Sequence, residues 1–389
     1  MKIRILTVMI GLVIITGFIT PSAAASFSTW SMPQNMGTPP NSAEDDMHVT
    51  ISPSGLSLYF SSNRPGGLGG TDIYVSQRAT LTSAWGAPQN LGATINSSAG
   101  DGVTSFSRDG RTAFMYSSRP GGLGGSDHYI MTRTDPNNDF GWSAPVNLAV
   151  INSASGEIGS TYFEDPVTGA GTLIFNSNRP GGVGLADFYQ STRNADGTFN
   201  APTLITELSS PAIEERGVIS RDGLEIFITT NRPGVLGMSD IYVSTRASTT
   251  APWNAPVPVE GINTASNEFS PTLSANGTTM YFSSNRAGGV GLMDLYSATR
   301  LVTTATGVEV SGRVTAPGGA GLRNARVWIT DSKGSIREVL TSSFGYFSFD
   351  NIAAGETYVI GVNSKRYRFN TRTIQVFDTL ADVDFSAME

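Results

Sequence analysis

The chain has 389 residues, a formal net charge of −7 and no cysteine. The lack of cysteine excludes disulfides, thiol catalysis and cysteine-ligated metals, and the acidic balance argues against nucleic acid as a partner. The 44 glycines, the 20 prolines and the lack of helical periodicity predict an all-β chain rich in turns.

Residues 1–25 have the features of a signal peptide. Lys2 and Arg4 precede an uncharged apolar run over 5–19, and three alanines at 23–25 fit a cleavage site. A membrane anchor is the alternative, but this run is shorter than the roughly 20 residues of a span. We therefore expect a periplasmic or secreted protein with no lipid-modified cysteine and no membrane span after signal removal.

A motif first met at residues 52–78 occurs five times. Each copy has an arginine, an aspartate 8 residues later and a second arginine after 6 more. Self-similarity at 53–60 residues is typical of propellers and solenoids, in which each unit buries its faces against its neighbours. The arginine–aspartate pairs are Arg64 and Asp72, Arg119 and Asp127, Arg179 and Asp187, Arg232 and Asp240, and Arg286 and Asp294.

Within each copy the pattern is β throughout. A turn precedes a short apolar run such as 58–60, which predicts a strand covered on both faces. A glycine-rich stretch then predicts a tight hairpin loop before a strand that starts at the aspartate. These loops are not phosphate cradles, because no helix start follows them.

A Trp-x-x-Pro piece or its variant recurs with the motif, first at 30–33, and predicts an outer edge strand. The first such piece precedes every copy of the motif, and none follows the last copy, which ends at Arg300. The simplest solution is a five-bladed β-propeller over residues 26–300, in which the Trp30 segment completes the fifth sheet.

The repeat pattern ends after residue 300. Residues 301–306 are predicted to be a linker, and residues 307–389 a small transthyretin-like or immunoglobulin-like β-sandwich with about seven short strands.

Both parts resemble known families. The motif, with its Ser-x-x-Gly turn, Ser-x-Arg, Gly-Gly-x-Gly loop and Asp-Ile-Tyr, resembles the WD40-like β-propeller repeat of bacterial cell-envelope proteins. Residues 310–314, 325–329 and 341–347 resemble the carboxypeptidase regulatory-like domain, which implies a sandwich without peptidase activity. Related envelope proteins add a peptidoglycan-binding domain, which this sequence lacks.

One acid recurs before the first strand of each copy. If the acids gather at the mouth of the central channel, they would attract a cation, a basic peptide or sugar hydroxyls. The alternative, which we favour, is that each acid accepts structural hydrogen bonds within its own sheet from the backbone or from a polar residue five positions earlier. The five acids are Asp46, Asp101, Glu157, Glu214 and Glu268.

The arginine–aspartate pairs also have two interpretations. Five arginines would grip an anion, or each pair would hold its hairpin loop shut, and we favour the second. His48 and His128 are single variations on the repeat template, so we predict no catalytic role for them. The sequence predicts no catalytic residue, no metal site and no cofactor.

Two functions remain open. The main hypothesis is a non-enzymatic binding or scaffold protein of the envelope, whose propeller face binds a protein, a peptide or a glycan. The alternative is a glycoside hydrolase that uses channel-mouth carboxylates such as Asp46, Asp101 and Glu157. Asymmetry distinguishes them, because an enzyme needs a pocket lined by non-repeated aromatic and carboxyl groups.

Overall fold

The computed structural model describes residues 26–166, 168–303, 307–376 and 379–388. These residues form 29 strands and no helix, which confirms the all-β prediction. They belong to two compact units, Ser26–Thr303 and the described residues from 307 onward. The predicted signal peptide lies outside the described residues, and none of the described elements has the helical length and apolar character of a membrane span.

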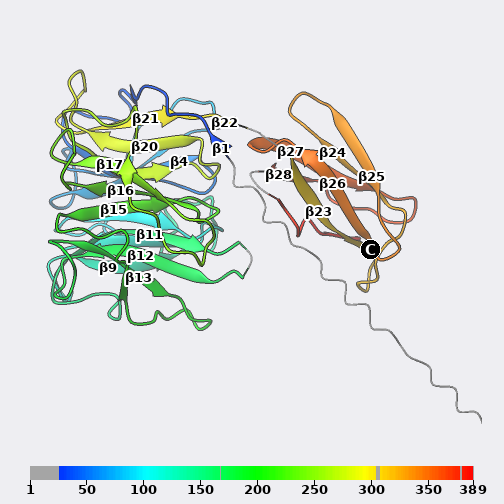
Figure 1. Ribbon diagram of the computed structural model, residues 1–389, viewed down its shortest axis with the longest axis horizontal. Helices are drawn as coiled ribbons and strands as arrows, with labels where there is room; N and C mark the ends of the chain where they lie inside the picture. The colour runs from blue at the N-terminus through cyan, green and yellow to red at the C-terminus, as the bar shows by residue number, and fades with distance from the viewer. Residues whose placement is uncertain (1–25, 167, 304–306, 377–378, 389) are drawn as a thin grey trace, which may run out of the picture. The chain divides into compact units, whose positions relative to one another are not determined.

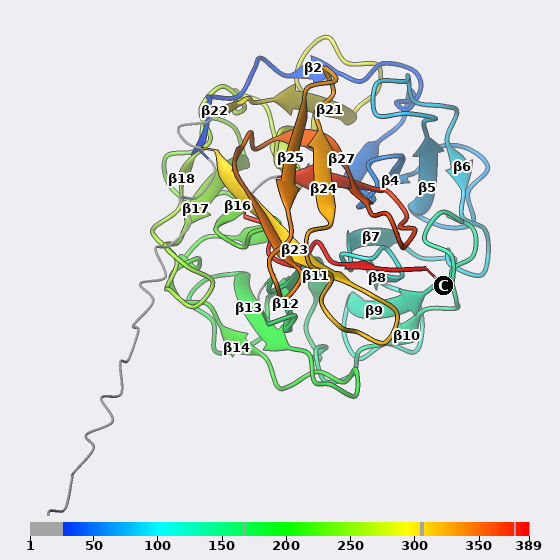
Figure 2. The same ribbon diagram turned by 90° about the vertical axis from the view of Figure 1, so that its right-hand side faces the viewer.

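The first unit contains five four-stranded antiparallel sheets (Figure 1). Four of them are simple meanders from an inner to an outer strand, and the last takes its outer strand from the N-terminal segment. The inner strands contact one another in sequence order and the last contacts the first, so the sheets form a closed ring (Figure 2). The inner strands are β3 (Asp46–Ile51), β7 (Asp101–Phe106), β11 (Glu157–Glu164), β15 (Glu214–Ile219) and β19 (Glu268–Leu273).

The second and third strands of each sheet carry the apolar core. The run over 58–60 is fully buried, as expected for a strand between two neighbouring sheets. The second strands are β4 (Ser57–Ser62), β8 (Thr112–Ser117), β12 (Gly171–Ser177), β16 (Glu225–Thr230) and β20 (Thr279–Ser284). The third strands are β5 (Asp72–Gln77), β9 (Asp127–Thr132), β13 (Asp187–Thr192), β17 (Asp240–Thr245) and β21 (Asp294–Thr299).

The outer strands are short and begin just after the Trp-x-x-Pro pieces. The tryptophans themselves therefore lie outside the outer strands. Their rings pack under arginines; the Arg78 guanidinium, for example, lies 4.3 Å from the centre of the Trp85 ring. The outer strands are β2 (Gln34–Asn35), β6 (Gln89–Asn90), β10 (Val146–Asn147), β14 (Thr203–Leu204) and β18 (Val257–Pro258).

The N-terminal segment closes the ring. Strand β2 pairs with β21 as the outer strand of the last sheet, and β1 (Ser26–Phe27) pairs with β22 (Val302–Thr303). The first residues of the predicted linker thus belong to the first unit. The ends of the ring are held together by backbone hydrogen bonds rather than by a covalent link.

The second unit is a two-sheet sandwich. Strands β23 (Val308–Thr315), β26 (Tyr346–Ile352) and β29 (Phe385–Ser386) form one sheet. The other contains β24 (Arg326–Thr330), β25 (Ile336–Leu340), β27 (Glu356–Asn363) and β28 (Arg372–Val376). Residues alternate between buried and exposed along β23, so one face of the strand fills a core shared with Val327, Ile329, Phe347 and Phe349.

Candidate functional site

The five recurring acids each occupy the first position of an inner strand and are fully buried. Each forms an ion pair with the first arginine of its own motif, at 2.5–3.1 Å. The pairs are Asp46 with Arg64, Asp101 with Arg119, Glu157 with Arg179, Glu214 with Arg232, and Glu268 with Arg286.

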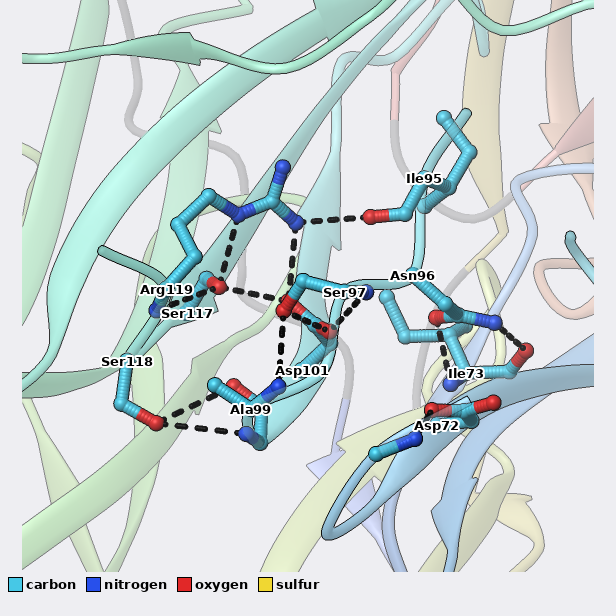
Figure 3. A network of polar contacts seen from close by, with 12 residues as sticks. Asp72, Ile73, Ile95, Asn96, Ser97, Ala99, Asp101, Ser117, Ser118 and Arg119 are labelled. Carbon is cyan, nitrogen blue, oxygen red and sulfur yellow. Dashed lines mark hydrogen bonds and ion pairs between the residues drawn. The ribbon is translucent and has the colours of Figure 1, made fainter. Parts of the chain in front are cut away.

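The second sheet shows the full arrangement (Figure 3). Asp101 accepts hydrogen bonds from the backbone N–H of Ser97 at 2.7 Å, from the Ser97 and Ser117 hydroxyls at 2.8 and 2.5 Å, and from Arg119 Nη2 at 2.8 Å. The carboxylate therefore has a full set of protein donors. Its polar neighbour Asn96 bonds instead to both backbone groups of Ile73 in the preceding sheet.

This geometry contradicts a ligand or cation site on Asp46, Asp101, Glu157, Glu214 and Glu268. A carboxylate with no exposed surface and a saturated set of donors is not available to a ligand in the channel. In the described part of the chain, no group of three or more histidines and acids is placed to hold a metal ion. The contacts are of the kind that the structural interpretation expects, and the donors are a backbone N–H, serine or threonine hydroxyls and an arginine, with no asparagine among them.

The arginines and aspartates of the motif are not paired with each other as expected. Arg64 binds Asp46, 18 residues earlier, because β3 and β4 are antiparallel and place Asp46 opposite Ser62. Asp72 accepts the backbone N–H groups of Leu68 and Gly69 instead, at 2.6 and 3.2 Å. The same loop contacts recur at Asp127, Asp187, Asp240 and Asp294.

His128 lies in the core between the second and third sheets, edge-on to Phe175 at 5.5 Å between ring centres. It is fully buried, and neither ring nitrogen has a hydrogen-bond partner among the described residues. Burial lowers the pKa of His128 to about 3, so its imidazole stays neutral. The side chain is a core residue of the propeller.

Replacing His128 with leucine is expected to flatten the loss of stability in acid. The folded-state pKa of His128 lies below the value of about 6.5 in the unfolded chain, so only the unfolded state gains this proton between pH 6.5 and 3. The wild type should therefore lose about 1.4 kcal/mol more stability per pH unit than His128→Leu in this window. Urea unfolding at pH 7, 5.5 and 4 measures this difference, and parallel pH dependences would refute it.

An axial cavity of about 130 Å³ lies where the inner strands end, whereas the five acids of the expected channel mouth lie where these strands begin. Its lining includes several serines and threonines, together with the aromatic residues Phe106, Tyr162 and Phe163. The equivalent rim positions of the five sheets carry different residues, namely Pro53, Arg108, Glu164, Arg221 and Ala275. The cavity is therefore asymmetric, although the sheets around it repeat.

Glu164 is the one carboxylate in the described lining of this cavity. It ends β11, which is longer than the other inner strands and leads into the insertion at 164–171. The backbone N–H of Arg108 donates to Glu164 Oε2 at 2.6 Å, and Arg108 Nη2 donates to the Glu164 carbonyl at 2.9 Å. These contacts fix one carboxylate oxygen at the rim. In the sequence, the stretch at 164–171 stands where the other copies of the motif have a shorter turn, and it marks this asymmetry.

A second non-repeated feature is a buried ion pair between Arg133 and Asp139, at 2.8 Å with both side chains nearly inaccessible. The Asp139 carboxylate also accepts the hydroxyls of Ser57 and Tyr59, both at 2.6 Å, and the amide of Gln77 at 2.7 Å. Burial and the charge of Asp139 raise the pKa of Tyr59, so the phenol remains a donor. This network ties the loop at 135–140 to the first sheet.

Several solved structures similar to the chain are glycoside hydrolases. An α-L-arabinofuranosidase of Podospora anserina is 11% identical, with 72% of this chain and 98% of that chain covered and a TM-score of 0.46. A xylan β-1,4-xylosidase of Bacillus halodurans is 11% identical, with 86% and 88% covered and a TM-score of 0.45. A Bacillus subtilis arabinanase is 14% identical, with 66% and 94% covered and a TM-score of 0.44.

These findings correct the main functional hypothesis. A non-enzymatic binding or scaffold protein was expected, whereas the similar solved structures are glycoside hydrolases, the class of the alternative. No curated protein sequence matches the chain. Residues 309–387 match the family described as carboxypeptidase regulatory-like domain, and the second unit is therefore such a domain, attached to a propeller-like first unit.

Proposed function

We propose that the chain is a glycoside hydrolase of the bacterial envelope that works in the axial cavity of the propeller. The observation that carries this proposal is the asymmetry of the cavity. A repeated fold supplies five equivalent positions at the rim, and they are occupied by one carboxylate, two arginines and two uncharged residues. Catalysis needs such unlike groups at unlike positions, whereas a symmetric ring of identical groups cannot divide the roles of acid and base.

The lining suits a sugar. Hydroxyls of Thr50, Thr161 and Thr272 match the hydroxyl groups of a pyranose, and the aromatic rings of Phe106 and Tyr162 offer apolar surface for its C–H faces. Arg108 lies beside Glu164, with its backbone N–H on the Glu164 carboxylate and its guanidinium on the Glu164 carbonyl. Polar groups with a few aromatic side chains in one concave site are typical of small-molecule pockets.

Glu164 takes the role of the catalytic acid and base. In its protonated form it gives its proton to the glycosidic oxygen as the bond to the anomeric carbon breaks, and it then removes a proton from the attacking water. The described lining contains no second carboxylate, which most glycosidases need. The geometry therefore favours a substrate-assisted reaction, in which the acetamido oxygen of an N-acetylated sugar attacks the anomeric carbon in place of a protein carboxylate.

The compartment follows from the sequence features. We propose that residues 1–25 direct export, that the sheets are WD40-like repeats of an envelope protein, and that the partner is a glycan of the periplasm or cell surface. An N-acetylated envelope glycan such as peptidoglycan is found in this compartment and carries the acetamido group that the substrate-assisted reaction needs.

Replacing Glu164 with glutamine is expected to lower kcat by about 10²–10⁴-fold, because the amide cannot transfer the proton. The measurement is the initial rate on peptidoglycan fragments, arabinan, xylan and a sialoside, with the N-acetylated substrate expected to be cleaved. The matched control is Glu207→Gln, which changes an exposed glutamate outside the cavity and should leave the rate unchanged. A panel with no cleaved substrate, or full activity in Glu164→Gln, would reject the proposal.

A further inference from the structure

Three side chains that do not repeat meet in the middle of the propeller. They are His48 of β3, Tyr116 of β8 and Arg216 of β15, from the first, second and fourth sheets. His48 Nδ1 lies 2.7 Å from the Tyr116 hydroxyl, and the Arg216 guanidinium lies 4.6 Å from the centre of the Tyr116 ring. Because the second and fourth sheets are not neighbours in the ring, these contacts cross its axis.

Two glycines of the inner strands make room for this cluster. A Cβ atom at Gly102 would lie 2.2 Å from a ring carbon of Tyr116, and one at Gly159 would lie 2.6 Å from Arg216 Cα. The equivalent positions in other sheets carry side chains, for instance Phe269 and His48. The glycines therefore allow Tyr116 and Arg216 to occupy space that the repeat would otherwise fill.

Arg216 lacks the partner that comparable arginines have. Three arginines among the described residues are buried, with 6–7% of their surface exposed: Arg133, Arg216 and Arg300. Arg133 pairs with Asp139 and Arg300 pairs with Glu225, whereas no described carboxylate forms an ion pair with Arg216. Its Nη2 atom is inaccessible and has no hydrogen-bond partner among the described residues.

An unpaired buried charge is strongly destabilising unless a counter-charge reaches it. The face of the Tyr116 ring supplies a partial contact to the guanidinium, but a cation–π contact does not satisfy an N–H donor. His48 adds no charge, because burial lowers its pKa well below the usual value and keeps it neutral. The adjacent Glu215 is only partly buried; its charge attracts the Arg216 guanidinium, but the two side chains form no ion pair among the described residues.

We propose that a small monovalent anion binds at Arg216 Nη2 in the centre of the propeller and completes the cluster with Tyr116 and His48. The chemistry that the site selects is one negative charge with a compact acceptor, which a halide ion and the carboxylate of a small acid share. Bound to the folded state alone, the anion stabilises the ring in proportion to the logarithm of its concentration. This inference does not depend on the proposed function.

The test is thermal unfolding of the full chain in increasing sodium chloride or sodium formate, with ionic strength held constant by the bulkier methanesulfonate. A rise of several degrees in chloride alone identifies a halide site, and a rise in formate identifies a carboxylate site. Arg216→Met should abolish the rise. Arg133→Met, which removes a buried arginine with its own carboxylate partner, should lower the melting temperature but keep the anion dependence.

A second measurement uses only the wild-type protein, so it does not depend on whether a variant folds. Crystals of the wild type grown in bromide should show anomalous scattering beside Arg216 Nη2 if the site takes halides, and formate should displace that signal if it takes carboxylates. The proposal is overturned if neither anion raises the melting temperature, or if Arg216→Met keeps the same anion dependence as the wild type.

Discussion

Deleting residues 26–40 is expected to lower the midpoint of thermal unfolding by about 10–20 °C, which corresponds to about 5 kcal/mol in a domain of this size. The deletion removes β2, whose Gln34 and Asn35 pair with β21, and it exposes that edge of the last sheet. It also removes the aromatic rings of Phe27 and Trp30, which lie 3.5 and 4.6 Å from the Arg300 guanidinium.

Hydrogen exchange locates this effect. Backbone amides of β21 should exchange faster after the deletion, whereas those of β17 should not, because β17 is covered by its own outer strand β18. Trp253→Ala is the matched control, since it removes an equivalent ring under Arg246 without opening the ring of sheets. An unchanged melting curve in the deletion would show that the N-terminal segment does not close the propeller.

Replacing Arg119 with methionine is expected to lower the free energy of unfolding by about 3–5 kcal/mol. The change leaves the fully buried carboxylate of Asp101 without its cation, and the remaining serine donors do not neutralise its charge. It also removes the Arg119 hydrogen bond to the Ile95 carbonyl at 2.6 Å, which holds the connection from the preceding sheet. Urea unfolding at pH 7 measures the loss.

A double replacement separates the destabilisation caused by an unpaired buried charge from the contribution of the ion pair to the free energy of unfolding. Arg119→Met with Asp101→Leu removes both charges, so it should be less destabilised than Arg119→Met alone. If the single variant is as stable as the wild type, or if the double variant is the less stable of the two, the buried pair does not have the role described here.

Much of the fold was predictable because the same pattern occurs five times in the sequence. A constant spacing from the first arginine to the aspartate and the second arginine implies one local geometry for all copies, and the apolar run at 58–60 indicates a strand buried on both faces. The order of the Trp-x-x-Pro pieces then implies closure at the N-terminus. The position of the outer strand was missed, because Trp30 packs under Arg300 and leaves the pairing to Gln34 and Asn35.

The partners within the repeat were harder to predict. Along the chain, Asp72 is closer to Arg64 than Asp46 is. In the fold, antiparallel pairing of β3 and β4 brings Asp46 to the arginine. Asp72 instead satisfies the backbone N–H groups of its loop. Which of two acids meets an arginine depends on strand register, and the motif alone does not reveal it.

The axial features were not predictable from the pattern, because they depend on distances across the ring. Tyr116 and Arg216 come from sheets that are not neighbours, so the spacing of the repeat does not predict their contact. The available signal was glycine at positions 102 and 159 inside inner strands, where a side chain is the rule and a glycine marks a close approach. Residues that interrupt the repeat therefore indicate the contacts across the axis better than the residues that make the repeat.

We propose that repeated residues build the ring, while unique residues at its axis act on the substrate. The most direct test is the turnover per folded molecule of Asp101→Asn and Glu164→Gln on the same N-acetylated glycan. We predict that Asp101→Asn unfolds at a lower temperature but retains wild-type turnover, and that Glu164→Gln keeps the wild-type melting temperature but loses turnover. Loss of turnover in folded Asp101→Asn together with full activity in Glu164→Gln would contradict the claim.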